Sequence, residues 1–284
     1  MRIERILVAA AVAVLAARAL PCAADEPLWE GGVGIAVLDF PDYRGSSQGR
    51  GYVLPVPYFV YRGTFLREDR NGLRGIFFEN ERVNLNLSVG ASLPVDSSRN
   101  HAREGMPDLH ATVEFGPSLD VALWEAANHR ARVELRLPLR GAVTIESHPR
   151  FIGGQFSPNV NLDVADPAGL RGWHLGMLAG PVFTDARYNR YFYEVQDAFA
   201  TPERPAYTTG GGFAGTQFIV ALSKRYPKFW VGGFARYDTL AGAKFEASPL
   251  VTSKHYYAAG IAVAWILGES HERVPVTELG ERAK

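Results

Sequence analysis

The feature that most constrains the fold is an unbroken alternation of polar and apolar residues. In residues 130–137 every second residue is charged, and the residues between them are aliphatic. Successive side chains of a β-strand point to opposite faces, so this pattern predicts a strand with one polar and one apolar face. Residues 83–89 repeat the pattern with asparagine and serine as the polar partners.

A soluble β-sandwich and a membrane β-barrel share this alternation. The sandwich turns its apolar face inward, whereas the barrel turns it toward lipid. An export signal, many such strands, 12 tyrosines and only 1 cysteine in 284 residues favour the barrel. We therefore predict an all-β fold, a transmembrane antiparallel up-and-down β-barrel of about twelve strands.

The first 24 residues have the form of a cleaved export signal. Arg2, Glu4 and Arg5 are followed by an apolar run over 6–17 and by small residues at 22–24. Such a segment is a secretory signal peptide, for which we predict cleavage after residue 24. Cys22 leaves a lipoprotein interpretation open, but Pro21 before it disfavours lipidation. Beyond residue 24 no apolar run approaches the ~20 residues that a membrane helix needs.

Composition excludes one class of partner and indicates one domain. The 30 basic and 30 acidic residues balance, which leaves no electrostatic footprint for nucleic acid. We found no linker or break in composition. The predicted organisation is a signal peptide (1–24), an outer-membrane β-barrel (25–267) and a charged, disordered periplasmic tail (268–284), for which a solvated extension without a partner is the alternative.

The gaps between strands predict the topology. The predicted strands are 28–38, 50–61, 64–69, 72–79, 82–93, 109–124, 130–143, 151–164, 170–184, 213–224, 228–239 and 255–267. Apart from the tight turn at Asn71-Gly72, long and short gaps alternate, as outer loops and periplasmic turns do in bacterial outer-membrane barrels. Residues 188–193 also resemble a strand, but a thirteenth strand would reverse the later loops. We therefore place them in the long outer loop 185–212, folded into the barrel mouth.

Alternation also predicts which side chains face the lumen. On strand 109–124 the odd positions are apolar and predicted to face lipid. The even positions carry charges, and the predicted lumen charge network comprises Glu114, Asp120, Arg132, Glu134, Arg136 and Arg140. Antiparallel pairing places Asp120 near Arg132 and Arg136, and Glu114 near Arg140. The network either fills a small barrel structurally or forms an anion- or solute-selective constriction.

Two segments near the start of the mature chain carry a distinctive set of residues: Pro41, Asp42, Tyr43, Arg44, Gly45, Pro55, Pro57, Tyr58, Tyr61, Arg62 and Gly63. These segments resemble the MltA-interacting protein (MipA/OmpV) family. Segments 187–193, 205–207 and 248–251 resemble the family as well. The resemblance implies an outer-membrane barrel and a scaffold that brings a lytic transglycosylase together with a penicillin-binding protein. Family chains commonly end on an aromatic residue that closes the last strand, whereas this chain continues past Gly268.

The motif residues also have physical interpretations. Residues 41–45 predict a turn-prone loop that Asp42 and Arg44 hold in place, with Tyr43 at the membrane–water interface. Pro55 and Pro57 donate no ladder hydrogen bond, so they predict a bulge or bend in their strand.

The sequence predicts no catalytic, cofactor or metal site. None of the 7 histidines belongs to a His-x-x-x-His pair, and no Gly-x-Ser-x-Gly elbow occurs. His148 beside Glu146 and Ser147 is the least implausible cluster, but adjacent residues usually point apart. Two non-enzymatic functions stay open, both with outer-membrane lipid as a partner. One is a scaffold or binding barrel acting through its periplasmic turns and tail, and the other is a narrow solute pore or uptake channel gated by loop 185–212.

Overall fold

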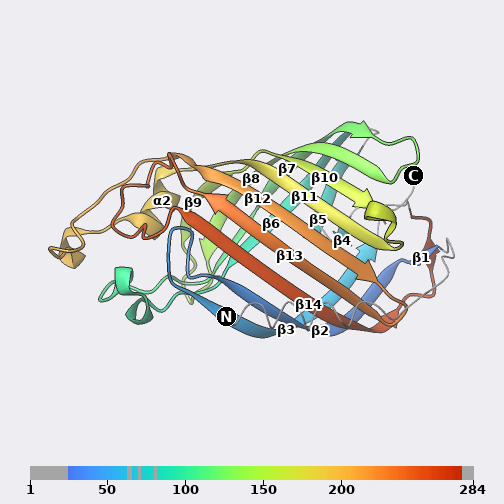
Figure 1. The fold of residues 1–284 in the computed structure, drawn as a ribbon, viewed down its shortest axis with the longest axis horizontal. Coiled ribbons are helices and arrows are strands. Elements are labelled where there is room, and N and C mark those ends of the chain that lie inside the picture. Colours follow the sequence, from blue (N-terminus) through green and yellow to red (C-terminus); the bar gives the residue numbers. More distant parts are fainter. Residues whose placement is uncertain (1–24, 63–65, 70–71, 80–81, 277–284) are drawn as a thin grey trace.

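A single antiparallel sheet closes on itself to form a barrel. The computed structural model describes residues 25–62, 66–69, 72–79 and 82–276. Its strands follow chain order around the wall, and the sheet closes because β8 and β11 both pair with β9 and β10. The predicted all-β antiparallel up-and-down barrel is confirmed. Figure 1 shows the strands inclined to the long axis of the barrel.

Most wall strands have 10 residues or more, and the shorter ones are β4, β5, β9 and β10. Their bounds are β2 Trp29–Pro41, β3 Gly49–Arg62, β4 Leu66–Asp69, β5 Gly72–Glu79, β6 Val83–Ser92, β7 Thr112–Glu125, β8 Ala131–Thr144, β9 Phe151–Phe156, β10 Asn159–Ala165, β11 Trp173–Thr184, β12 Gly212–Arg225, β13 Phe229–Thr239 and β14 His255–Glu269. β4 and β5 have 4 and 8 described residues, and β9 and β10 have 6 and 7.

The strand expected over 151–164 is divided in two. β9 and β10 are separated at Ser157 and Pro158, and both lie between β8 and β11. Pro158 has no N–H to donate to a ladder, which favours an interruption at this point. β9 and β10 therefore share one position, and the thirteen strands of the sheet occupy twelve positions around the wall.

The two ends of the barrel differ, as the gap lengths predicted. One end, the loop end, carries the connections 42–48, 93–111, 145–150, 185–211 and 240–254. It includes helix α2 (Ala186–Tyr193) and the short helices η1 (Ser97–Arg99), η2 (His101–Arg103) and η4 (Asp197–Phe199). The opposite end, the turn end, carries the turns 126–130 and 226–228 and the segment 166–172 with η3 (Pro167–Gly169). The short gaps also predict Gly63 and Asn80 at the turn end, but both lie outside the described residues.

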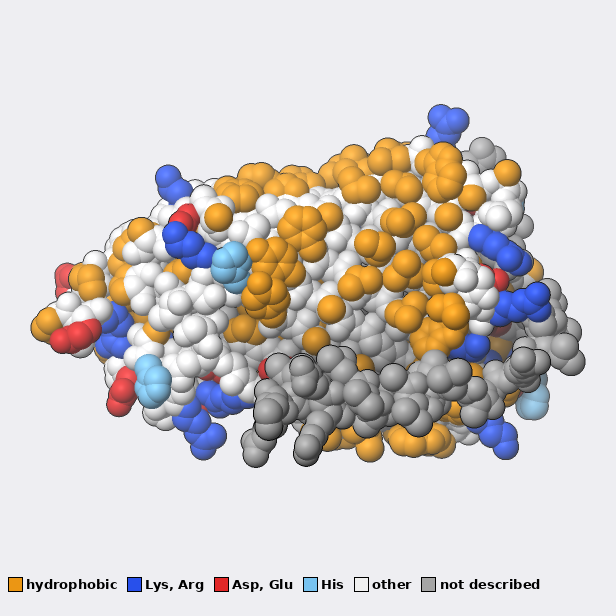
Figure 2. Space-filling view, in the orientation of Figure 1, with side chains coloured by type: hydrophobic (Ala, Val, Ile, Leu, Met, Phe, Trp, Pro, Cys, Tyr) orange, Lys and Arg blue, Asp and Glu red, His pale blue; other side chains and the backbone are white. Residues whose placement is uncertain are grey.

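An apolar belt surrounds the barrel between these ends. Figure 2 shows hydrophobic side chains across the middle of the visible face and charged side chains gathered at both ends. On β7 the outward residues Phe115, Leu119 and Leu123 are exposed, whereas Glu114 and Asp120 are buried. No helix among the described residues is long and apolar enough to cross a membrane. The exposed apolar belt is instead made of strand residues.

The chain beyond β14 is ordered further than the sequence suggested. β14 continues to Glu269, and β15 (Arg273–Val274) pairs with β1 (Glu26–Pro27) at the turn end. The expectation of a disordered tail from residue 268 is therefore wrong for residues 268–276. Ser270 contributes to this order, because its backbone N–H donates to the carbonyl of Trp29 (2.9 Å).

Candidate functional site

The longest loop closes the loop end of the barrel with a helix. Asp185 caps α2, since its carboxylate accepts hydrogen bonds from the backbone N–H of Tyr188 (2.7 Å) and of Gly154 on β9 (2.7 Å). Gly153 has φ +122°, and a Cβ there would lie 2.4 Å from the backbone nitrogen of Tyr188. The helix start is therefore seated directly on β9. Residues 188–193, which resemble a strand in sequence, form this helix inside the outer loop.

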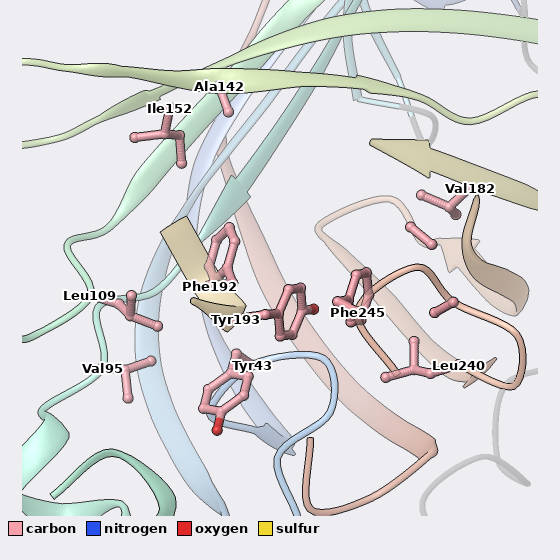
Figure 3. Packing of buried hydrophobic residues seen from close by; sticks show 12 residues of the cluster. Tyr43, Val95, Leu109, Ala142, Ile152, Val182, Phe192, Tyr193, Leu240 and Phe245 are labelled. Carbon is pink, nitrogen blue, oxygen red and sulfur yellow. The ribbon is translucent and has the colours of Figure 1, made fainter. Parts of the chain in front are cut away.

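A buried apolar cluster fastens α2 to the other loops, and we name it the loop-end cap. Its residues are Tyr43, Val95, Leu109, Ala142, Ile152, Val182, Phe192, Tyr193, Ala214, Leu240, Ala243 and Phe245. Figure 3 shows Tyr193 of α2 between Phe192 and Phe245, with Tyr43 close by. The rings of Tyr193 and Phe245 are stacked with centroids 3.7 Å apart. Loops far apart in sequence therefore share one packed core.

The first family motif builds part of this cap. The hydroxyl of Tyr43 donates to the carbonyl of Leu250 (2.7 Å), and Arg44 pairs with Asp238 (2.6 Å between Nε and Oδ2). The hydroxyl of Tyr193 in turn donates to the carbonyl of Arg44 (2.8 Å). Asp42 accepts a hydrogen bond from the side-chain amide of Asn100 (2.8 Å). These contacts hold four loops together.

Two further motif residues shape the loop 42–48: Pro41 ends the strand before it, and Gly45 lies at its turn. Pro41 is the last residue of β2 and lies opposite Gly49 of β3. Gly45 has φ +103°, a backbone conformation that favours glycine, and its carbonyl accepts from the backbone N–H of Thr252 (2.7 Å).

The predicted interfacial position of Tyr43 is wrong. The ring is buried in the cap, and the guanidinium of Arg103 lies 5.9 Å from its centroid. Burial raises the pKa of Tyr43 to about 12, and burial likewise lowers the pKa of Arg103. A loop tyrosine marks the membrane–water interface only when its ring reaches lipid. The Tyr43 ring packs against the other loops of the loop-end cap instead.

The lumen charge network lies on the inner face of the barrel. Glu114, Asp120 and Glu134 are buried. Asp120 is paired in register with Arg136, at 3.9 Å between Oδ2 and Nε. Arg136 also contacts Glu134 (2.8 Å) and Asp163 on β10 (3.1 Å).

Arg132 is placed differently from the expected pairing with Asp120. It lies opposite Glu125, after a bulge between Ala122 and Trp124, and its Nε lies 3.0 Å from the carboxylate of Glu134. Because Asp120 lies opposite Arg136, Arg132 falls nearer the turn end, and the bulge moves its partner by one residue from Trp124 to Glu125. Asp120 instead accepts hydrogen bonds from Asn86 (2.8 Å) and Ser118 (2.6 Å).

One carboxylate links the network to the loop-end cap. The hydroxyl of Tyr188 on α2 donates to Glu114 (2.8 Å), and the guanidinium of Arg140 lies 4.0 Å from the same carboxylate. Arg140 also donates from Nε to Ser88 (2.9 Å). The structure therefore brings Glu114 and Arg140 together and adds the helix as a third member.

A small polar cavity lies beside these charges. It encloses about 260 Å³ and includes Asp120, Arg136, Arg140, Asn159 and Asn161 in its lining. Its charged lining consists of two guanidinium groups, Arg136 and Arg140, and one carboxylate, Asp120, and the rest is amide, hydroxyl and apolar side chains. A volume of this size holds several water molecules.

A second ion cluster lies at the turn end around a buried glutamate. Glu30 is fully buried and pairs with Arg62 of the second motif (2.8 Å) and with Arg225 (2.8 Å). Arg62 also pairs with Glu26 and donates to the carbonyl of Pro27 (2.9 Å). The β1–β15 pair is thereby tied to the inside of the barrel.

The remaining motif residues lie in β3 or just after it. Tyr58 packs near Trp230, with centroids 6.2 Å apart, and Tyr61 pairs with Trp29. Pro55 and Pro57 lie within an uninterrupted β2–β3 register, so of the predicted bulge or bend the bulge is wrong. Gly63 lies outside the described residues.

The geometry offers no catalytic arrangement among the described residues. The carboxylate of Glu146 accepts hydrogen bonds from the Thr144 hydroxyl (2.6 Å) and the Arg150 guanidinium (2.9 Å). The imidazole of His148 has its hydrogen bond with the neighbouring Ser147 (3.3 Å). In the same part of the chain, no group of three His, Cys, Asp or Glu side chains could hold a metal ion.

Several partners in these clusters were missed by sequence reasoning. Asp163 and Asn161 have the parity of lumen-facing residues, so alternation on strand 151–164 could have identified them. Glu30 and Asp238 also have lumen-facing parity on strands 28–38 and 228–239, but alternation does not name their partners. Tyr188 carries no such signal, because it lies in a loop and its partner Glu114 lies on a distant element.

The chain is similar to known outer-membrane proteins. A family model described as MltA-interacting protein MipA matches residues 33–267. Outer membrane protein OmpV of Vibrio cholerae serotype O1 is 26% identical over 213 residues, which cover 73% of this chain and 76% of that protein. Outer membrane protein Omp26La of Vibrio anguillarum is 24% identical over 213 residues, with the same shares covered. Among solved structures, a bacterial polysaccharide outer membrane secretin has a TM-score of 0.40 and 10% identity, covering 86% of this chain and 99% of that one.

Proposed function

Since the chain belongs to the MltA-interacting protein MipA family and is an outer-membrane protein, we propose that it is a non-enzymatic scaffold or binding protein. Its partner would be a lytic transglycosylase of the cell wall, and a penicillin-binding protein would join the same assembly. The loop end faces outward in this proposal, and the turn end faces the periplasm.

The observation that carries the proposal is a rigid, exposed surface at the turn end. The turn 126–130 and the segment 166–172 are linked by an ion pair between Arg130 and Asp166 (3.5 Å). The non-glycine residues of positive φ in the described chain, His129, Asp166 and Ala168, all lie in these two connections. Backbone strain of this kind persists where the surroundings hold it, and it is a reason to look for function.

This surface, which we name the turn-end platform, also presents apolar side chains. Trp124, near the end of β7 just before the turn 126–130, is 54% exposed, and Leu170 of the segment 166–172 is 51% exposed. Exposed aromatic and aliphatic residues are typical of a contact that binds another protein. A scaffold needs such a surface on the side of its enzyme.

Binding measurements with the purified protein test this proposal. We expect a lytic transglycosylase to bind the detergent-solubilised barrel, and the double variant Trp124→Ala, Leu170→Ala to weaken binding at least tenfold, about 1.4 kcal/mol. Ile145→Ala serves as the matched control, because Ile145 is 61% exposed at the opposite end. Equal binding by the platform variant and the control would exclude the platform as the contact.

The competing proposal is a narrow solute pore or uptake channel gated by loop 185–212. The loop-end cap lies at one end of the barrel and the Glu30 ion pairs lie at the other. We therefore expect no stable conductance in planar bilayers. Steady channels that widen when residues 194–208 are deleted would favour the pore.

A further inference from the structure

The polar cavity of the lumen lies along one continuous part of the barrel wall. Its lining comes from β6, β7, β8, β10, β11 and β12, which follow one another around the wall because β8 pairs with β10. The cavity has a volume of about 260 Å³. Since a molecule of liquid water takes about 30 Å³, this is room for several waters or for one small organic molecule.

Two of the charged residues in the lining already have partners within the protein. Arg136 contacts the carboxylates of Glu134 (2.8 Å) and Asp163 (3.1 Å). Both carboxylate oxygens of Asp120 accept hydrogen bonds from neighbouring side chains (2.8 and 2.6 Å). Neither group therefore depends on a ligand for its hydrogen bonds.

Arg140 is the charged lining residue with donors to spare. A guanidinium carries N–H groups on all three of its nitrogens. Among the described residues, Arg140 donates one hydrogen bond, from Nε to Ser88 (2.9 Å). Its Nη1 lies 4.0 Å from the carboxylate of Glu114, which is beyond hydrogen-bond distance. The side chain is 22% exposed, so its two terminal nitrogens are available to an acceptor in the cavity that Arg140 lines.

These donors favour a ligand with a single negative charge. The lining holds two guanidinium groups and one carboxylate, Asp120, so it carries one net positive charge. Glu114 is not a lining residue, and it accepts a hydrogen bond from Tyr188 of α2. A carboxylate matches the planar N–H pairs of a guanidinium with its two oxygens. A dianion such as phosphate would add a second negative charge beside Asp120.

β11 and β12 give the cavity an apolar wall. The register across β10, β11 and β12 places Asn161, Leu178 and Ile219 side by side on one face of the sheet. Asn161 is buried and donates to Asp163 of the lumen charge network (2.5 Å), so this is the inner face. Leu178 and Ile219 therefore offer an apolar surface inside the barrel, in the lining that Arg140 shares.

Small residues on the same face leave the space unfilled. Gly176 and Ala221 lie opposite each other, two residues along their strands from Leu178 and Ile219. Because side chains of a strand alternate, both positions face inward. Ala221 is nevertheless exposed, so it borders open space in the lumen. A larger side chain at position 221 would occupy the cavity.

We propose that this cavity binds a small organic carboxylate. Its carboxylate group accepts hydrogen bonds from Arg140, and its carbon skeleton lies against Leu178 and Ile219. Displacing water from these two side chains adds a hydrophobic contribution to the charge-assisted hydrogen bonds. The site is independent of the turn-end platform and goes beyond the proposed scaffold function.

Three ligands of one shape test the charge that the cavity selects. Para-fluorobenzoate, para-fluorobenzamide and para-fluorobenzamidine share a planar skeleton and carry an anionic, a neutral and a cationic end group. Fluorine NMR follows their binding to the barrel in lipid nanodiscs, with empty nanodiscs as the blank. We expect the benzoate to bind at least about fivefold more tightly than the other two. Equal binding of benzoate and benzamide, or tightest binding of benzamidine, overturns the proposal.

Two arginine variants test the contact with the carboxylate. Arg140→Gln should weaken binding of the benzoate at least about tenfold and leave binding of the benzamide within about twofold. Arg132→Gln is the matched control, because Arg132 belongs to the same strand and charge network but not to the lining. Equal effects of the two variants on the benzoate would assign the loss to the network as a whole and overturn the contact with Arg140.

A further pair of variants tests the cavity without removing a charge, and it decides the question even if Arg140→Gln does not fold. Ala221→Leu should abolish binding of the benzoate by filling the space. Ala235→Leu makes the same substitution on the outer face of β13, in register with the exposed Val220, and should leave binding unchanged. Binding that survives Ala221→Leu overturns the proposal. Transglycosylase binding should be the same for both variants, so failure of one proposal is distinguishable from failure of the other.

Discussion

Glu114 is the residue at which the loop-end cap and the lumen charge network meet. It is buried, accepts a hydrogen bond from Tyr188 and lies beside Arg140. We expect Glu114→Gln to lower the thermal midpoint and to reduce the free energy of unfolding by about 1–3 kcal/mol. The reason is that the buried guanidinium of Arg140 no longer faces a negative charge. The double variant Glu114→Gln, Arg140→Gln should recover part of the loss, as measured by the heat-dependent gel shift.

The same measurement on Asp120→Asn extends the test to the second carboxylate. Asp120 accepts from Asn86 and Ser118, so an amide in its place leaves one of these donors badly oriented. We expect a smaller loss than for Glu114→Gln. Unchanged stability together with altered ion conductance would indicate a hydrated lumen and would favour the pore.

Gly153 provides a test of how α2 is seated. Its φ of +122° is strained for any other residue, and a Cβ would collide with the start of the helix. We expect Gly153→Ala to expose residues 185–211 to limited proteolysis. Gly105→Ala is the matched control, because Gly105 also has positive φ (+77°) but has nothing within 4 Å of the added atom. Equal cleavage of both variants would mean that strain alone, not the helix contact, decides the effect.

At the scale of elements, the loop-end cap should loosen in alkali. Burial raises the pKa of Tyr43 to about 12, from an unfolded value of about 10. A group with a raised folded pKa contributes stability that is fully present below pH ~10 and is lost as the pH rises toward ~12, at about 1.4 kcal/mol per pH unit. Phenolate absorbance and proteolysis of the loops should therefore rise together in this range.

A tyrosine-to-phenylalanine variant separates ionisation from packing. Tyr43→Phe keeps the ring but removes the hydroxyl that donates to Leu250. We expect this variant to be less stable than the parent at pH 8 and to lose less stability between pH 10 and 12. Tyr193, whose pKa burial also raises, keeps some alkaline sensitivity in the variant. A variant with the full alkaline loss of the parent would assign the effect to other groups.

At the scale of the whole molecule, the two ends predict sidedness in the outer membrane. Asn128 and Tyr226 lie in turns at one end, and Ser98 and Pro202 lie in the long connections at the other. We expect cysteines at Ser98 and Pro202 to react with an impermeant maleimide on intact cells, and cysteines at Asn128 and Tyr226 to react only after lysis. Labelling of Asn128 but not Ser98 on intact cells would reverse the orientation.

Local patterning of the chain determined the class of fold and the direction of side chains. Alternation with a period of two is a property of a single strand, so it separates Phe115 from Glu114 without knowledge of the neighbours. Gap lengths are also a local property of the sequence, and they assigned the long connections to one end and the short turns to the other. The inward position of Glu114 and Asp120 and the outward position of Leu123 followed from the sequence.

Only the tertiary structure decided which groups meet. Arg136 contacts Asp163 because β8 and β10 are neighbours in the closed sheet, and Glu114 meets Tyr188 because a distant loop folds back as a helix. Tyr43 is buried by loops that converge from across the sequence. The sequence also left the role of Pro55 and Pro57 open. A proline shows that a backbone donor is missing, but not which neighbouring strand lacks that hydrogen bond. Which strand that is depends on the pairing, which only the assembled sheet specifies.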